Sequence, residues 1–284
     1  MILQISLTVP EAKEIIAKAA ANLPEIKRAM KSGKIFLKGG TTVSALAREL
    51  VGTDLYICGR ISPRGTKGSK SMIFDVPHSV LIDKGVVRNA DDWEEAEIKN
   101  LQKQDVFVIG ANAIDKDGNA AIMAGSFLGG PPGKILGGLM AEGINIIILA
   151  GIEKLIPTTI SDAVRACGRK KVDISFGMAV GLIPIIGKLI TEQTAIEMLA
   201  DVKCTVIGKG GICGAEGSTT MVVEGDKSQI YKIYKYVESV KGFTTCGIKA
   251  SLEECERGSM GCKEELACIY KKPIKPNFWS DSNV

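Results

Sequence analysis

Two continuous apolar segments near the middle of the chain constrain its fold more than any other feature. Residues 105–112 (DVFVIGAN) and 144–151 (INIIILAG) each carry an uninterrupted run of apolar side chains. Such runs are typical of parallel strands that are buried on both faces, because strands with one face in water alternate apolar and polar residues. A glycine-rich loop (125–134) and a helical stretch lie between them. We therefore predict an α/β fold with helices on both faces of a largely parallel sheet.

The pattern changes near residue 200. Residues 203–208 and 218–225 are expected to be strands, and 226–242 an amphipathic helix. We predict an α/β domain over residues 1–200, followed by a small α+β unit over 201–284 that ends in a cysteine-bearing tail.

Local signals define three further segments. Residues 10–31 have helical apolar periodicity with a break or kink at Pro24. Asp117-Gly118 is a turn signal between two short apolar runs. The apolar segment 171–187 has no clear helix or strand period, so it stays unassigned.

Charge and composition exclude several classes of protein. The net charge is +4, with 45% hydrophobic and 24% charged residues, which is close to the globular average. Lys and Arg are interleaved with Asp and Glu, so no basic stripe indicates a nucleic-acid or membrane-surface partner. The longest uncharged apolar stretch, 174–187, is shorter than the ~18 residues of a spanning helix. The N-terminal residues lack the pattern of a secretory signal, so we expect a cytoplasmic protein.

The carboxyl ends of parallel strands share one edge of a sheet, and ligands bind there. The first candidate at this edge is the turn from a strand into a helix formed by Lys38, Gly39, Gly40, Thr41 and Thr42. Glycines allow close backbone approach, and the first turn of a helix presents free N–H groups to a phosphate or a carboxylate. An ordinary capped turn is the equally weighted alternative.

Two more loops could contact an anion. The loop 125–134 contains Gly125, Gly129 and Gly130 and leads into a helix whose first turn carries Lys134. The basic segment 60–70, with Arg60 and Arg64, could close over a ligand as a lid or form an exposed hairpin. Tight helix packing and solvated side chains are the alternatives for the first loop.

Polar residues also follow the predicted strands. Asn112 could orient a substrate and Lys154 could bind it. Asp115 and Glu153 are the acids that could transfer a proton, since burial would raise the pKa of a carboxyl group. His78 is the sole histidine, and its apolar context favours a structural role.

The tail carries Cys246, Cys255, Cys262 and Cys268. Four thiolates could bind zinc or an iron–sulfur cluster. Their spacing is irregular and contains no CxxC, so ordinary reduced cysteines are the favoured alternative. The sequence has no nicotinamide or flavin motif.

The order of these motifs resembles a known superfamily. Residues 38–47 (KGGTTVSALA), 108–126 (VIGANAIDKDGNAAIMAGS) and 145–158 (NIIILAGIEKLIPT) resemble the sugar-phosphate isomerases and CoA transferases, with the nearest local likeness to the lactate-utilisation (LUD) domain. The resemblance implies a ribose-5-phosphate isomerase-like fold, a homodimer, and a small phosphate- or CoA-bearing metabolite at the strand ends.

The chain departs from that pattern at the catalytic positions. Asn112 stands where the isomerases have an aspartate, and their lysine and glutamate positions fall near Ala124 and Gly133. An isomerase- or transferase-like enzyme is therefore one expectation. A non-catalytic ligand-sensing or assembly subunit is the second, and a LUD-like redox-associated protein with a metal-binding tail is the third.

Overall fold

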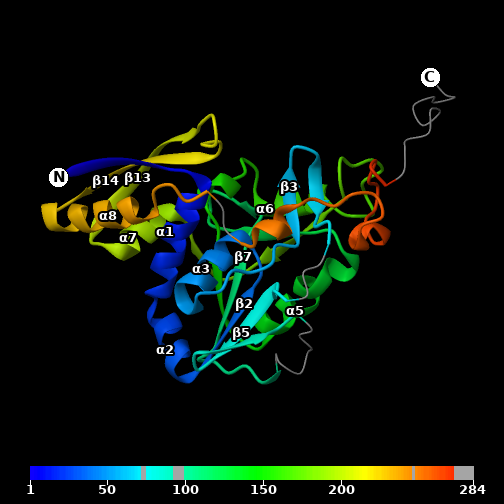
Figure 1. Cartoon of the computed structure of the whole chain (residues 1–284), viewed down its shortest axis with the longest axis horizontal. Helices are drawn as coiled ribbons and strands as arrows, with labels where there is room; N and C mark the ends of the chain where they lie inside the picture. Colours follow the sequence, from blue (N-terminus) through cyan, green and yellow to red (C-terminus); the bar gives the residue numbers. More distant parts are fainter. Residues whose placement is uncertain (72–74, 92–98, 245–246, 272–284) are drawn as a thin grey trace.

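Parallel strands form the middle of the largest sheet (Figure 1). In the computed structural model, which describes residues 1–71, 75–91, 99–244 and 247–271, the strand order of this sheet is β12–β10–β7–β2–β5–β6. The parallel strands are β2 (Lys34–Lys38), β7 (Val106–Gly110), β10 (Asn145–Leu149) and β12 (Lys188–Ile190). Strands β5 (Ser79–Asp83) and β6 (Val86–Asn89) run antiparallel at one edge. The predicted α/β class with a largely parallel sheet is confirmed.

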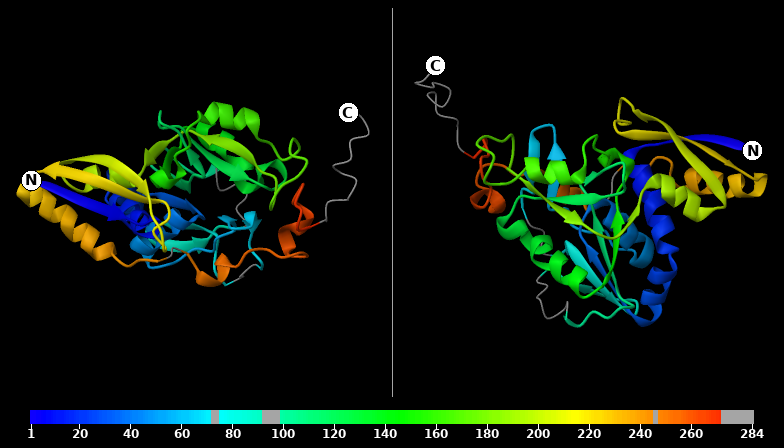
Figure 2. Two further views of the ribbon diagram at one scale, coloured as in Figure 1. Left: turned by 90° about the horizontal axis from the view of Figure 1, so that it is seen from above. Right: turned by 180° about the vertical axis from the view of Figure 1, so that it is seen from behind.

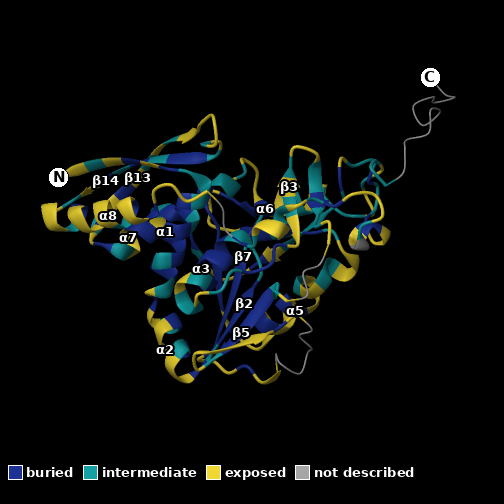
Figure 3. Ribbon diagram, in the orientation of Figure 1, coloured by how far each residue is buried: buried dark blue, intermediate teal, exposed yellow. Residues whose placement is uncertain are grey.

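The apolar runs of the central strands fill two separate cores. On β2, Ile35 and Leu37 belong to the core on one face, whereas Phe36 belongs to the core on the other. The Phe36 ring stacks on that of Phe107 with the centroids 5.1 Å apart. Both faces are covered, so neither needs polar residues, and Figure 3 shows these strands as the buried middle of the molecule.

Helices cover both faces, as the sequence predicted. One face carries α1 (Val9–Ala21), α2 (Pro24–Ser32) and α3 (Thr41–Val51), and the other carries α5 (Gly130–Ala141) (Figure 1). Helix α1 starts at a capping box between Thr8 and Glu11, and the predicted interruption at Pro24 separates α1 from α2.

A second sheet pairs the first strand of the chain with two strands that follow residue 200. Its strand order is β1–β14–β13, with β1 (Ile2–Leu7) antiparallel to β14 (Ser218–Gly225) and β14 antiparallel to β13 (Val202–Gly210). Helices α7 (Glu192–Leu199) and α8 (Lys227–Val240) accompany it at one end of the molecule (Figure 2). The small unit expected after residue 200 therefore contains a strand from the start of the chain.

A third sheet pairs β8 (Ala113–Ile114), β9 (Ala120–Ala124) and β11 (Gly181–Ile185). The predicted turn at Asp117-Gly118 joins β8 to β9, and Gly118 takes a φ of +81°. Strand β11 lies in the segment that the sequence left unassigned. Helix α6 (Ile160–Ala166) and the short 3₁₀ helices η1 (Phe127–Gly129) and η2 (Ile152–Lys154) complete this region.

The C-terminal tail, residues 247–271, lies against a short hairpin. The hairpin consists of β3 (Gly59–Ser62) and β4 (Gly65–Gly68), and the tail contains η3 (Lys249–Leu252) and η4 (Met260–Lys263). The Cys255 N–H donates to the carbonyl of Gly68 at 2.8 Å. No helix in the described part of the chain combines the length and apolar character that crossing a membrane requires.

Candidate functional site

The parallel strands bring three of the predicted segments to one edge of the sheet. Lys38, Gly110 and Leu149 are the last residues of β2, β7 and β10. The turns that follow them hold Gly39–Thr42, Asn112 and Glu153. Strands lie ~4.8 Å apart, so the ends of β2 and β10, with β7 between them, are separated by roughly 10 Å. The predicted shared edge is present, and a small metabolite could span it.

Lys38 is the unusual residue at this edge. It is only 5% exposed, and its Nζ donates a hydrogen bond to Ser79 Oγ at 3.2 Å. No described residue forms an ion pair with it. Burial lowers the pKa of Lys38 to about 8, an effect that Asp91 and Cys58 oppose only in part. Buried charges in proteins are normally paired, so this lysine needs an explanation.

Two groups that interact electrostatically with Lys38, the imidazole of His78 and the thiol of Cys58, are neutral. Burial, together with the charge of Lys38, lowers the pKa of His78 to about 3. His78 Nδ1 lies 2.7 Å from the carbonyl oxygen of Tyr56, so Nδ1 carries the proton and donates it, and the lone pair resides on Nε2. Cys58 is exposed as a residue, but desolvation of its thiol raises the pKa of Cys58 to about 11, against the opposing charge of Lys38. Both side chains therefore stay uncharged at neutral pH.

Asp91 is the nearby acid, and backbone groups occupy its oxygens. They accept hydrogen bonds from the N–H groups of His78 (2.9 Å) and Ser79 (2.6 Å). The carboxylate thus fixes the start of β5 and the position of Ser79 opposite Lys38. It acts on the lysine from beyond ion-pair distance.

Helix α3 adds free N–H groups beside Lys38. Its N-cap is Gly40, and no side chain caps its first turn. The N–H groups of a first turn have no acceptor within the helix, and they carry a partial positive charge. Gly39 is required by close packing, because a Cβ there would lie 2.0 Å from the carbonyl oxygen of His78. The predicted turn of Lys38 to Thr42 therefore combines a buried amine at the end of β2 with the free N–H donors of the helix that follows it in the chain.

Two glutamates mark the other end of the edge. Glu153 lies in η2; its Oε1 is buried and accepts no hydrogen bond from described residues, and the nearest cation is Lys154 Nζ at 3.7 Å. Glu192, 1% exposed, accepts from Ile152 N–H at 2.8 Å and from Thr219 Oγ1 at 2.7 Å. Burial raises the pKa of Glu192, and the charge of Glu153 adds to this effect. Glu153 remains the acid best placed to accept a proton.

In the structure, the side chains of Asp115 and Asn112 accept hydrogen bonds from backbone N–H groups. The Asp115 carboxylate accepts the backbone N–H groups of Ile160, Asp117 and Asn119 at 2.9–3.0 Å. These bonds, the one from Ile160 first, lower the pKa of Asp115 to about 2. A carboxylate held this way is a poor proton acceptor. Asn112 Oδ1 accepts from Met123 N–H at 2.9 Å and so holds β9.

The two arginines of the hairpin contact the tail. Arg60 Nη2 donates to the carbonyls of Ile57 and Ser251 and to Ser69 Oγ, while its Nε and Nη1 are buried without a partner among described residues. Arg64 pairs with Glu254 at 3.0 Å and lies over the Tyr270 ring at 4.4 Å. Of the two arrangements considered for segment 60–70, the structure has the hairpin.

Two glycines of the loop before α5 adopt left-handed backbone conformations. Gly129 and Gly130 take φ values of +79° and +63°, in the left-handed region that favours glycine. A Cβ on Gly125 would meet the sulfur of Met178 at 2.4 Å. Lys134, in the first turn of α5, is exposed.

The tail cysteines do not form a recognisable metal site in the described part of the chain. Cys255, Cys262 and Cys268 are buried and not in disulfides, and Cys246 lies outside the described residues. Among the described residues, no group of three or more His, Cys, Asp or Glu side chains could hold a metal ion. Cys255 instead lies 3.7 Å from Glu265 Oε1.

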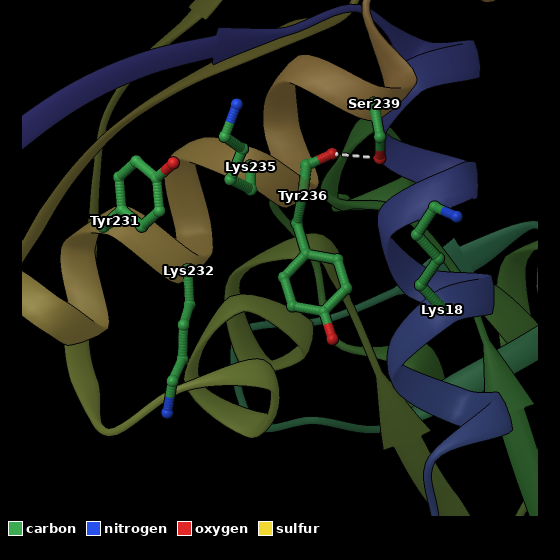
Figure 4. Close-up of a pocket in the computed structure, with 6 residues that line it drawn as sticks. All are labelled: Lys18, Tyr231, Lys232, Lys235, Tyr236 and Ser239. Atoms are coloured by element: carbon green, nitrogen blue, oxygen red, sulfur yellow. Dashed lines mark hydrogen bonds between the residues drawn. The ribbon is translucent and has the colours of Figure 1, made fainter.

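A surface hollow between α8 and α1 is the other candidate site (Figure 4). Its lining residues are Lys18, Tyr231, Lys232, Lys235, Tyr236 and Ser239. Lys18 pairs with Glu49 at 3.4 Å and Lys235 with Glu238 at 2.8 Å. Because carboxylates already neutralise these two lysines, we favour the edge at Lys38 as the functional site.

Sequence reasoning missed several members of this site. It did not single out Cys58, Ser79, Asp91 or Glu192. It gave His78 a structural role, which agrees with the hydrogen bond between His78 Nδ1 and the carbonyl of Tyr56. The signal for His78 and Ser79 was their place at the start of an apolar segment that pairs with β2. Nothing in the local sequence shows that this pairing is antiparallel, with Ser79 opposite Lys38.

Comparison with known proteins adds no constraint. No family model, curated protein or solved structure matches this chain. The assignment of function therefore depends on the geometry and chemistry of the edge at Lys38.

Proposed function

We propose that this chain binds a small anionic metabolite at the sheet edge formed by Lys38 and the first turn of α3. One observation carries the proposal: Lys38 is buried and has no ionic partner among the described residues. A buried ammonium group without a partner is unfavourable, and a bound anion would supply the missing charge.

The surrounding groups favour an anion over other ligands. The uncapped first turn of α3 offers N–H donors and a partial positive charge, which suit a phosphate or a carboxylate. Thr41 and Thr42 begin that turn, and their hydroxyl groups could add hydrogen bonds. These features support the phosphate- or CoA-bearing metabolite that the superfamily resemblance implies.

If the protein is an enzyme, Glu153 is the base in this proposal, and the reaction is isomerase- or CoA transferase-like on an isomerase-like fold. Its buried Oε1 has no hydrogen-bond donor among described residues, and its strand ends roughly 10 Å from that of Lys38. A ligand-sensing subunit is the second candidate. The hydrogen bonds that Asp115 and Asn112 Oδ1 accept from backbone N–H groups favour it, because these oxygens are already used to hold the protein's own backbone.

The test is a thermal-shift panel of sugar phosphates, acyl-CoAs, nucleotides and organic acids, with inorganic phosphate as the simplest probe. A ligand at ~100 times its dissociation constant should stabilise the fold by about 2.7 kcal/mol. The shift should disappear in Lys38→Met and persist in Lys34→Met, which removes a lysine from the other end of the same strand. A flat panel, or equal shifts in both variants, would contradict the proposal. Turnover of a bound compound then separates the enzyme from the sensor.

A further inference from the structure

We propose that the metabolite is an anionic aldehyde or ketone, and that the Lys38 amine forms an imine with its carbonyl carbon. This inference rests on the proposed function, and it names the chemical class of the ligand of that site.

The surroundings of Lys38 suit a nucleophilic amine. A lysine attacks a carbonyl only as the neutral amine, which burial away from carboxylates favours. Lys38 is buried and donates a hydrogen bond to the neutral hydroxyl of Ser79. Of the groups around it, His78 and Cys58 are uncharged, and the carboxylate of Asp91 acts from beyond ion-pair distance. With a pKa of about 8, about a quarter of Lys38 is free amine at pH 7.5, against about one in a thousand for an ordinary lysine.

Lys67 provides the internal comparison. It is even more buried, at 1% exposure, and its Nζ lies over the Tyr270 ring at 4.5 Å. The thiol of Cys255 also contacts Lys67, and Glu265 acts on the same thiol. The two buried lysines therefore have different surroundings: a neutral hydroxyl group beside Lys38, and an aromatic ring and a thiol beside Lys67. Lys67 serves as the buried control that should not react.

The chemistry balances without any further reactant. The lone pair of Nζ attacks the carbonyl carbon, a C–N bond forms, and the electron pair of the C=O π bond moves to oxygen. The two amine hydrogens then leave with that oxygen as water, and a C=N bond remains. Ser79 Oγ, 3.2 Å from Nζ, is placed to pass a proton between nitrogen and oxygen. Lys38 becomes a neutral amine by releasing one proton from its ammonium group, and return of one proton to the imine nitrogen gives the protonated imine. Ammonium and carbonyl are thus converted into protonated imine and water with no net change in charge.

In this proposal the anionic group of the ligand binds the free N–H groups of the first turn of α3, while the carbonyl carbon reacts with Lys38. Helix α3 begins at Thr41, three residues after Lys38 in the chain. Short compounds that carry both groups therefore fit better than long ones.

Imine trapping tests the inference on the full chain. The protein is incubated with glycolaldehyde phosphate and sodium cyanoborohydride, which reduces an imine to a stable secondary amine, and modified lysines are located by peptide mass spectrometry. We expect Lys38 to react at least tenfold faster than Lys67 and Lys34, with a rate that is half-maximal near pH 8. Neutral glycolaldehyde, the matched probe without phosphate, should react more slowly at Lys38.

The outcomes separate the inference from the proposed function. If inorganic phosphate stabilises the wild type but not Lys38→Met, while exposed lysines are trapped and Lys38 is not, the imine is overturned and the anion site stands. If phosphate has no effect and Lys38 is not trapped, both the anion site and the imine are contradicted. Lys38→Arg keeps the charge and should bind phosphate without trapping. If Lys38→Arg does not fold, the pH dependence of trapping in the wild type, with a half-maximal rate near pH 8, tests whether Lys38 is the reacting amine.

Discussion

Lys38 Nζ donates a hydrogen bond to Ser79 Oγ at 3.2 Å. The two residues are paired in the sheet, with Lys38 as the last residue of β2 and Ser79 as the first residue of β5. Asp91 in turn accepts the N–H group of Ser79 at 2.6 Å. The buried amine is thus oriented by a hydroxyl whose own backbone is fixed by a carboxylate.

Replacing Ser79 by alanine should weaken the orientation of Lys38 without removing its charge. Loss of one hydrogen bond costs about 1 kcal/mol, so we expect imine trapping at Lys38 to slow roughly fivefold. The pH of half-maximal rate should shift as well, which a purely structural role would not produce. Ser6→Ala, which removes an exposed hydroxyl pair with Thr220, is the control and should leave both values unchanged.

Stability should depend on pH through Lys38. Its pKa is about 8 in the folded protein and 10.5 when unfolded, so between these values the unfolded chain binds more protons. The free energy of unfolding should therefore rise with pH in this window, by at most roughly 3 kcal/mol. Lys38→Met should lose that rise and be the more stable protein below pH 8. Urea unfolding of both proteins from pH 7 to 10.5 measures the difference, and parallel curves would contradict the assignment.

Asp115 should matter for stability and not for ligand binding. Asn at this position loses an acceptor for the backbone N–H groups, so Asp115→Asn should lower the free energy of unfolding by about 2 kcal/mol. The wild-type advantage should fade as the pH falls from 3.8 towards 2, since the lowered pKa then no longer keeps the carboxyl ionised. Asp117→Asn, at an exposed position, should change stability by less than ~0.5 kcal/mol. Loss of phosphate binding in Asp115→Asn would instead give Asp115 a place in the site.

Glu192 should tolerate an isosteric amide and not a truncation. Gln can accept from Ile152 N–H and donate to Thr219 Oγ1, and it avoids the charge that burial disfavours. We expect Glu192→Gln to equal or exceed the wild type in unfolding free energy at pH 7. Glu192→Ala should be less stable by about 2–3 kcal/mol, because both donors lose their acceptor. A Gln variant as unstable as the Ala variant would show that the charge itself is needed.

The sequence predicted the parts of the fold that depend on local patterns. The apolar runs of β7 and β10, the interruption at Pro24 and the turn at Asp117-Gly118 each follow from side-chain type and spacing. The pairing of β1 with β14 does not, since apolar periodicity shows that a strand is buried but not which strand lies beside it. The hairpin of β3 and β4 was one of two alternatives, because a basic glycine-rich segment fits both.

In the candidate site, too, local sequence predicted some features, whereas others arise from tertiary packing. The turn from Lys38 to Thr42 was predicted from its glycines and its place between a strand and a helix. Burial of Lys38, and the neutrality of His78 beside it, arise from tertiary packing that no local spacing encodes. Asp115 shows the converse: an acid after a strand looked suited to proton transfer, and the hydrogen bonds that occupy it come from a turn and from the distant N–H of Ile160.

The pairing of β1 with β14 also has a consequence for folding on the ribosome. Ile5 pairs with Met221, so the first strand has no partner until more than two hundred further residues have been synthesised. Contacts this distant in sequence carry a large loop-closure cost and form late. Strands β2, β7, β10 and β12 can assemble before that point, with Lys38 already at their edge. The sheet of β1, β14 and β13 is completed only after β14 has been synthesised, beside a central sheet that is already formed.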